Sequence, residues 1–233
     1  TANGTADTAE QRIGIRTIQV SSKTGLLLNG QPRTMKGGCI HHDLGILGSA
    51  DHAAAERRRI RLMKESGFDA IRAAHNPFGP AFLDACDELG MLVVEEAFDE
   101  WVMGRTSFGL HVTFEQCWEK DLEDMITRDY NHPCIVMWST GNEVEERDGT
   151  ADGFAWAKRL ANKVRSLDAS RPVSATACAL FSEYGNRPAG GTTGNQALNM
   201  AYDTFAEGRA IWGPGPPPHL APLDGEGYNN NGP

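Results

Sequence analysis

Apolar segments of two kinds alternate through the middle of this chain, and their order constrains the fold more than any other feature. Short, continuously apolar runs predict strands at 35–40, 68–74, 91–98, 135–143 and 173–179. Segments with apolar residues every three or four positions predict helices at 53–66, 80–89, 113–130 and 153–167. Strands that are apolar on both faces and separated by helices indicate a parallel sheet covered by helices.

Two α/β folds fit this order, a doubly wound sheet and a (β/α)8 barrel. A doubly wound nucleotide binder carries a glycine-rich turn after its first strand, and GGCIHHDLG at 37–45 matches neither GxGxxG nor a P-loop. Polar residues instead follow the ends of four strands: His41, His42 and Asp43; His75 and Asn76; Glu95, Glu96 and Asp99; Asn142 and Glu143. Because a barrel active site needs such convergence at one rim, the sequence favours a TIM barrel.

The barrel pattern weakens after residue 180, where 185–222 reads as loops apart from one helical stretch. The segment LDGEGYN at 223–229 predicts a sixth strand. A full barrel takes about 250 residues, and only about six strands fit here, so we expect a truncated barrel. An open barrel exposes two strand edges, which predicts a homo-oligomer, poor solubility or a repacked fold.

Charge and hydropathy exclude several classes of partner. The formal net charge of −9 argues against binding to nucleic acid or an anionic membrane, because phosphates recruit Lys and Arg. The basic run ERRRIR at 56–61 is typical of the solvated face of a helix. No apolar stretch approaches the roughly 18 residues of a membrane span.

The cysteines and the N-terminal residues bear on the cellular compartment. Five cysteines without CxxC spacing indicate buried free thiols rather than disulfides or a zinc site: Cys39, Cys86, Cys117, Cys134 and Cys178. Residues 1–10 lack the basic and apolar regions of a signal peptide and are typical of a disordered tail. Both features favour a cytoplasmic protein.

Glu143, at the end of the apolar run IVMWSTGNE, is the first candidate for chemistry. Two carboxyl groups beside a sugar cleave a glycosidic bond when one protonates the leaving oxygen and the other attacks the anomeric carbon or activates water. Partial burial after an apolar strand favours the raised pKa that the acid needs. The structural alternative is that Glu143 caps the next helix or forms a surface ion pair.

The histidines, the paired glutamates and two tryptophans each have two interpretations. One interpretation is a metal site formed by His41, His42 and His75 with Asp43 or Glu96, although no strong zinc motif is present. The other is that neutral histidines hold sugar hydroxyls. Because neighbours on a strand face opposite sides, one of Glu95 and Glu96 should face the site and the other should pair with an Arg, for which Arg72 is the candidate. Trp101 and Trp138 could stack on a sugar or pack in the core.

Together these segments resemble glycoside hydrolase family 2, which includes β-galactosidases, β-glucuronidases and β-mannosidases. The resemblance lies in two long motifs, FDAIRAAHNPFGPAFLDACDELGMLVVEEAFDEW at 68–101 and RDYNHPCIVMWSTGNE at 128–143. GLLLNGQPRTMKGGCIHHD at 25–43 is similar to the start of the family's barrel, and QRIGIRTIQV at 11–20 to the last strand of a preceding β-sandwich domain. The similarity covers roughly residues 11–181. It implies a tail and a sandwich strand over 1–30, then a C-terminally incomplete catalytic barrel over 31–233.

The resemblance assigns roles residue by residue. It makes Glu143 the general acid/base and Asn142 the donor to the sugar 2-hydroxyl. It places His41, His75, Glu96, Asp99 and Trp101 in the substrate site. The implied enzyme is a retaining hydrolase of terminal β-linked sugars, most similar to β-galactosidases through EEAFDEW at 95–101, and it needs no cofactor and no metal. Its partner is a β-glycoside or an oligosaccharide.

The chain departs from the family at the nucleophile, a Glu that cannot be placed by motif. HLAPLDGEGYNNNG at 219–232 resembles the family's sixth strand, which precedes the nucleophile. Glu226 is a second candidate carboxylate within that segment. Three hypotheses therefore stay open: a retaining glycosidase, a non-catalytic barrel fragment that binds sugar, and a small complete barrel that recruits Glu226, Glu96 or Asp99.

Overall fold

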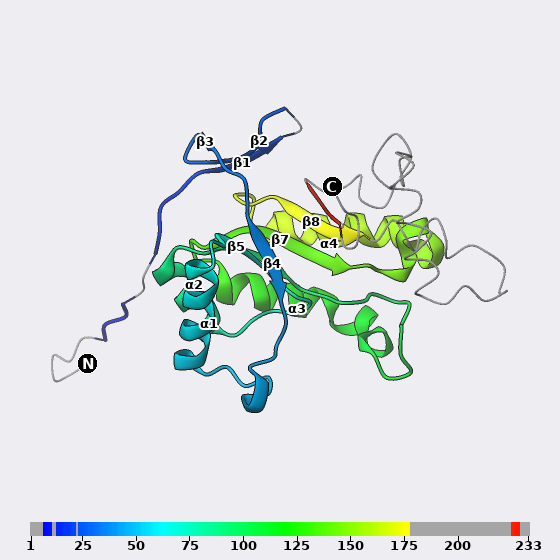
Figure 1. Cartoon of the computed structure of the whole chain (residues 1–233). Helices are drawn as coiled ribbons and strands as arrows, with labels where there is room; N and C mark the ends of the chain where they lie inside the picture. Colours follow the sequence, from blue (N-terminus) through cyan, green and yellow to red (C-terminus); the bar gives the residue numbers. More distant parts are fainter. Residues whose placement is uncertain (1–6, 11–12, 22, 178–224, 229–233) are drawn as a thin grey trace, which may run out of the picture.

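The structure is a computed structural model that describes residues 7–10, 13–21, 23–177 and 225–228. Its centre is a six-stranded parallel sheet whose strands lie in chain order (Figure 1). The strands are β4 (Gly37–Ile40), β5 (Ala70–Ala73), β6 (Leu92–Glu96), β7 (Ile135–Asn142), β8 (Val173–Ala177) and β9 (Gly225–Tyr228). The predicted α/β class, the parallel order and the sixth strand are confirmed.

Four helices connect the first five strands of this sheet. They are α1 (Ala53–Glu65), α2 (Pro80–Leu89), α3 (Phe114–Asp129) and α4 (Gly153–Leu167), all within two residues of the predicted ranges. Helix α2 begins with Pro80, whose missing N–H costs nothing in the first turn, and ends at Gly90, which adopts the left-handed conformation that glycine tolerates. Local signals therefore place both ends of this helix.

The core lies where apolar helix faces meet one face of the sheet. Ile60 of α1, Phe82 of α2, Leu122 of α3 and Leu160 of α4 are fully buried in one cluster. Alternation along β5 sends Ile71 into this cluster and turns the neighbouring residue to the other face of the sheet. Polar side chains on that second face are therefore kept away from the apolar core.

A small antiparallel sheet precedes β4. It contains β1 (Ile18–Ser21), β2 (Gly25–Leu28) and β3 (Gln31–Pro32), in that order. The sequence predicts a strand only in 11–20, so β2 and β3 are additions to the predicted elements. The turn between these two holds Asn29 and Gly30 with φ of 52° and 74°, the pair favoured by two-residue hairpins. The hairpin crosses the predicted domain boundary at residue 30, and that boundary and the sandwich domain stay predictions.

Four cysteines lie in the described residues, and all four are free thiols. Cys86 and Cys134 are buried as predicted, whereas Cys39 is exposed and Cys117 is partly exposed, which corrects the expectation that all are buried. Cys178 lies outside the described residues. No helix in the described part of the chain is long and apolar enough to cross a membrane.

Candidate active site

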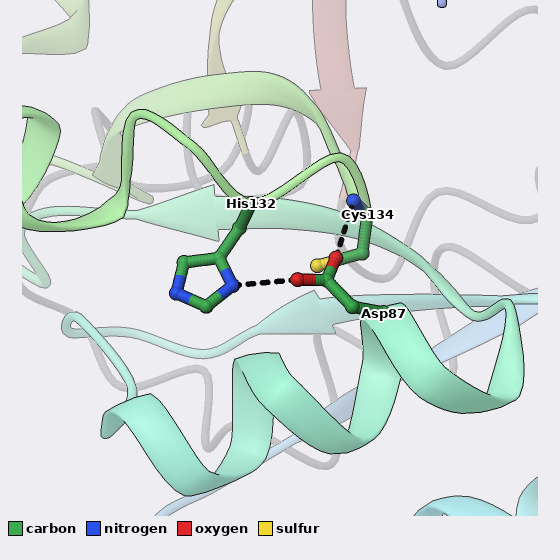
Figure 2. A group of neighbouring side chains, drawn as sticks. All are labelled: Asp87, His132 and Cys134. Atoms are coloured by element: carbon green, nitrogen blue, oxygen red, sulfur yellow. Dashed lines mark hydrogen bonds and ion pairs between the residues drawn. The ribbon is translucent and has the colours of Figure 1, made fainter. Parts of the chain in front are cut away.

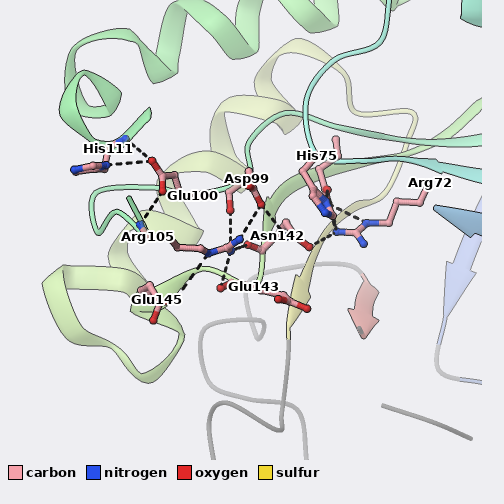
Figure 3. A network of polar contacts seen from close by, with 10 residues as sticks. Arg72, His75, Asp99, Glu100, Arg105, His111, Asn142, Glu143 and Glu145 are labelled. Carbon is pink, nitrogen blue, oxygen red and sulfur yellow. Dashed lines mark hydrogen bonds and ion pairs between the residues drawn. The ribbon is translucent and has the colours of Figure 1, made fainter. Parts of the chain in front are cut away.

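Polar side chains gather where β5, β6 and β7 end, on the face of the sheet turned away from the apolar core (Figure 3). We call this group the rim network: Arg72, His75, Glu96, Asp99, Arg105, Asn142 and Glu143. Five of its members, His75, Glu96, Asp99, Asn142 and Glu143, were predicted as site residues. The structure thus brings together side chains that are up to 71 residues apart in the sequence.

Glu96 anchors the inner half of the rim network. Its carboxylate is fully buried and forms a forked ion pair with Arg72, whose Nη2 lies 2.9 Å and 2.8 Å from the two oxygens. His75 Nδ1 lies 2.8 Å from Oε1, and the Ser139 hydroxyl donates to Oε2 at 2.6 Å. The sequence predicted that Arg72 pairs with the glutamate that faces away from the site, and this was wrong: Arg72 pairs with Glu96, on the face that carries the rim network. Because both oxygens are occupied, Glu96 supports Arg72 and His75 rather than facing solvent.

Glu95 points to the opposite side of β6, as the alternation along a strand requires. It is fully buried, and its Oε1 accepts a hydrogen bond from the Phe78 N–H at 2.8 Å. Burial, with repulsion from Asp129, raises the pKa of Glu95 well above its ordinary value. Glu95 therefore belongs to the core side of the sheet.

The Asn142 amide is held between two charged groups. Its Oδ1 accepts from Arg72 Nη2 at 2.7 Å, and its Nδ2 donates to Asp99 Oδ1 at 2.8 Å. A cation on one side and a carboxylate on the other determine which amide atom is oxygen and which is nitrogen. The nitrogen is therefore oriented as a donor at the strand end, and the donation to the sugar 2-hydroxyl stays a prediction.

Glu143 follows Asn142 in an uncommon backbone conformation, with φ of 45°. Its N–H donates to the Thr176 carbonyl of β8 at 2.7 Å, and its side chain is half-buried. The next helical segment, 145–148, has no side-chain cap. Within the described residues, the Glu143 carboxyl forms no ion pair or hydrogen bond, so neither structural alternative holds there.

Arg105, in the loop between β6 and α3, is a member of the rim network that the sequence did not predict. Its guanidinium donates to the carbonyl oxygens of Asn142 and Glu143, the latter at 3.0 Å, and to Asp99 Oδ1 at 3.0 Å. Nothing in the local sequence pattern identifies this contact, because Arg105 lies in a loop and is 38 positions from Glu143.

The residues after β4 lie near His75 but do not form a metal site. The exposed His41 ring meets the His75 ring edge-on, with centroids 4.9 Å apart. His42 stacks on Phe78, and the Asp43 carboxylate accepts from the Gly45 N–H. In the described part of the chain, these residues and Glu96 do not bring three ligand atoms together. The predicted contact of His41 with a sugar hydroxyl stays a prediction.

Trp101 does not have the geometry predicted for a sugar-stacking residue. Its side chain is fully buried in the core cluster, and its indole N–H donates to the Thr140 carbonyl at 2.9 Å. A fully buried ring offers no face to a ligand, so the structure supports core packing. Trp138 is also fully buried and donates to Asp168 at 2.9 Å.

Glu226 lies in β9, where its backbone pairs with Ala175 of β8. The strand is parallel to β7 and β8, so it ends at the same edge of the sheet as Asn142. The Glu226 side chain lies outside what the structure describes. Its role as a second carboxylate therefore stays a prediction.

A second cluster of titratable groups lies at the other end of β7, and we call it the base clamp: Asp87, His132 and Cys134 (Figure 2). His132 Nδ1 lies 2.7 Å from Asp87 Oδ2, and the Cys134 N–H donates to Asp87 Oδ1 at 2.8 Å. The Cys134 thiol points to the Leu83 carbonyl. The clamp ties α2 to the segment that leads into β7.

The chemistry of the base clamp fits an ion pair better than a metal centre. The hydrogen bond to Asp87 raises the pKa of His132. Burial alone would raise the pKa of Asp87, but hydrogen bonds from His132 and Cys134 outweigh it and hold that pKa below its ordinary value. Burial raises the pKa of the Cys134 thiol well above its ordinary value, which disfavours the thiolate that a metal needs.

Comparisons with known proteins agree with this architecture. The family model for glycosyl hydrolases family 2, TIM barrel domain, matches residues 18–186. A beta-galactosidase of Bacteroides ovatus is 37% identical, over 70% of this chain and 23% of its own length. A putative beta-glucuronidase of Formosa agariphila is 38% identical, over 63% of this chain and 14% of its own length.

A solved structure gives the same result. The crystal structure of a family 2 member from Bacteroides cellulosilyticus superposes with a TM-score of 0.74 at 39% identity, covering 93% of this chain and 24% of that chain. The chain therefore spans about a quarter, or less, of the length of these three relatives. Since the family model covers most of this sequence, the chain belongs to glycosyl hydrolase family 2, through that family's TIM barrel domain.

Proposed function

We propose that this chain provides the acid/base half of a retaining glycoside hydrolase that acts on terminal β-linked sugars, with β-D-galactosides as the preferred substrates. One observation carries the proposal: Glu143 presents a half-buried carboxyl at the end of β7, beside an oriented Asn142, and its backbone is held by Thr176 and Arg105. The relatives named beta-galactosidase and beta-glucuronidase support the substrate class.

The reaction assigns a step to each group. Glu143 gives its proton to the glycosidic oxygen while a second carboxylate attacks the anomeric carbon, so that the C–O bond to the leaving group breaks and a glycosyl-enzyme bond forms. Glu143 then takes a proton from water, which displaces the carboxylate. Asn142 donates to the sugar 2-hydroxyl, and His41, His75 and Asp99 contact other hydroxyls.

Glu226 is our candidate for the second carboxylate within this chain. Retention requires the two carboxyl groups to lie about 5–5.5 Å apart, and inversion requires about 6.5–9.5 Å. The candidate stands on the place of Glu226 in β9, a strand that ends at the same edge of the sheet as Asn142. If Glu226 is the nucleophile, Glu226→Gln stops turnover of every substrate, including those with excellent leaving groups.

The decisive experiment compares this chain with its Glu143→Gln variant on a panel of aryl β-glycosides. We expect kcat on phenyl glycosides to fall by about 10²–10⁴-fold, because a general acid contributes that much. Activity on 2,4-dinitrophenyl glycosides should fall far less, since that leaving group needs no proton. Equal turnover by both proteins would refute the role of Glu143. Saturable binding of galactose without any turnover would support the sugar-binding alternative.

A further inference from the structure

Glu143 occupies a backbone conformation that its neighbours must maintain. With φ of 45° it is one of four described non-glycine residues with positive φ, and such residues persist where surrounding contacts hold them. One contact is the hydrogen bond from its N–H to Thr176. The other is the hydrogen bond from Arg105 to its carbonyl oxygen at 3.0 Å. The two peptide groups that flank the Glu143 Cα are thus each held by another part of the chain.

Arg105 links the loop between β6 and α3 to the end of β7 (Figure 3). Its Nη2 donates to the carbonyls of Asp99, Asn142 and Glu143, and its Nη1 donates to Asp99 Oδ1. The same Asp99 oxygen accepts from the Asn142 amide. A planar guanidinium with five donors in a rigid fork suits this arrangement, whereas an ammonium group does not.

The loop that carries Arg105 is itself held in place. Glu100 is buried, and its carboxylate accepts from the Arg105 N–H at 3.0 Å and from the His111 N–H at 3.0 Å. The His111 ring lies 3.1 Å from the same carboxylate. Two points of this loop, Arg105 and His111, are therefore held by one anionic group, and Arg105 projects from a braced segment.

We propose that Arg105 is a positioning residue for the acid/base step, a role that rests on the proposed function of Glu143. The direction of the Glu143 carboxyl depends on its own φ and ψ, and Arg105 holds the carbonyl that sets ψ. Misplacement of a catalytic group by about 1 Å costs about 10²-fold in rate. Arg105 contacts the backbone of Glu143 and not the substrate. Its role is to fix the direction in which the Glu143 carboxyl points.

The test uses the full chain and four proteins: wild type, Arg105→Ala, Arg105→Lys, and Arg33→Ala as the matched control. Arg33 is a half-exposed arginine in a single ion pair with Asp69, outside the rim network. Each protein is assayed on phenyl and 2,4-dinitrophenyl glycosides of one sugar. We expect Arg105→Ala to lower kcat on the phenyl glycoside about 30-fold or more and on the dinitrophenyl glycoside about threefold or less, with Arg105→Lys in between and Arg33→Ala unchanged.

A second measurement is independent of turnover. Hydrogen exchange of the Glu143 amide reports the bond to Thr176, and we expect it to be about tenfold faster in Arg105→Ala, with no change at Trp138 in the middle of β7. Equal loss on both glycosides, or unchanged exchange at Glu143, overturns the proposal. If wild type cleaves neither glycoside, the proposed function fails and the exchange result alone decides whether Arg105 holds Glu143. If Arg105→Ala does not fold, Arg105→Gln replaces it.

Discussion

Each end of β7 carries a cluster in which a His contacts a carboxylate, yet the two clusters differ in what they can do. The base clamp combines an Asp, a His and a Cys around the start of the strand (Figure 2). The rim network combines acids, a His and arginines around its end (Figure 3). Residue type alone therefore does not distinguish a reactive site from a structural one.

Backbone conformation and pairing make the distinction. The side chains of the base clamp form hydrogen bonds within the clamp or to the nearby Leu83 carbonyl, and none of its residues has a positive φ. The rim network holds Glu143 at a positive φ and leaves its carboxyl without an ion pair among the described residues. A reactive group is positioned when its backbone is held by other residues and its side chain is left without an ion pair.

The largest effect that separates the two clusters should come from Glu96→Gln. The change removes a buried charge that Arg72, His75 and Ser139 all contact, and breaking such a pair costs about 3–5 kcal/mol of unfolding free energy. We also expect kcat to fall about 10²-fold, because Arg72 no longer holds Asn142. Urea denaturation and aryl glycoside assays measure both. A stable variant with unchanged kcat would show that Glu96 does not support the other residues of the rim network.

A moderate effect, on stability alone, should come from Asp87→Asn in the base clamp. Asparagine keeps the shape and still accepts from the Cys134 N–H but loses the charge beside His132, so we expect the unfolding free energy to fall by about 2 kcal/mol. The kcat of the folded protein should not change. Glu65→Gln, which removes an exposed ion pair with Arg61, is the control and should change neither quantity.

The pH dependence of that difference follows from the signs of the two shifts. His132 has a raised pKa in the folded state, so its contribution is complete below the ordinary histidine value of about 6.5 and is lost as pH rises through the raised value. Asp87 has a lowered pKa, so its contribution is complete above about 3.9 and is lost as pH falls through the lowered value. The difference between wild type and Asp87→Asn should therefore peak between about pH 4 and 6.5. A difference that does not vary with pH would contradict the ion pair.

The smallest effect should come from Cys134→Ser. A hydroxyl replaces a buried thiol that points to the Leu83 carbonyl, and we expect a change of about 1 kcal/mol in unfolding free energy. A hollow of about 340 Å³ lined in part by Asp87, Pro133 and Cys134 gives small ions access to the clamp. Added zinc should not raise the melting temperature of wild type relative to the variant. If zinc raised the melting temperature of wild type but not of the variant, the base clamp would be a metal centre.

Much of the fold could be predicted because local signals and tertiary packing agree. Pro80 and Gly90 delimit α2, and the buried run 135–142 is a strand with apolar residues on both faces. The Asn29–Gly30 hairpin was missed although its signal was present in the sequence. Alternation along β6 predicted that Glu95 and Glu96 lie on opposite faces, but it assigned Arg72 to the wrong glutamate, because Arg72 and Glu96 share one face of the sheet.

The parts of the site that could not be predicted depend on loops and on burial. Arg105 contacts the end of β7, and its loop is held by Glu100 and His111. The residues in these contacts are not spaced at a helix or strand period, so no sequence pattern reveals them. Trp101 follows a predicted site segment, but its ring turns into the core, because a large apolar side chain gains more from burial than from a solvent-exposed rim.

The sequence by itself determined the order of strands and helices, five of the seven rim side chains and the family, because periodicity and motif are local properties of the chain. Only the tertiary structure decided which rim groups are supports and which carboxyl is kept available. It did so through contacts between β5, β6, β7, β8 and the loop that carries Arg105. The backbone of Glu143 is held by hydrogen bonds to residues 33 and 38 positions away, and such pairing exists only after the sheet has formed.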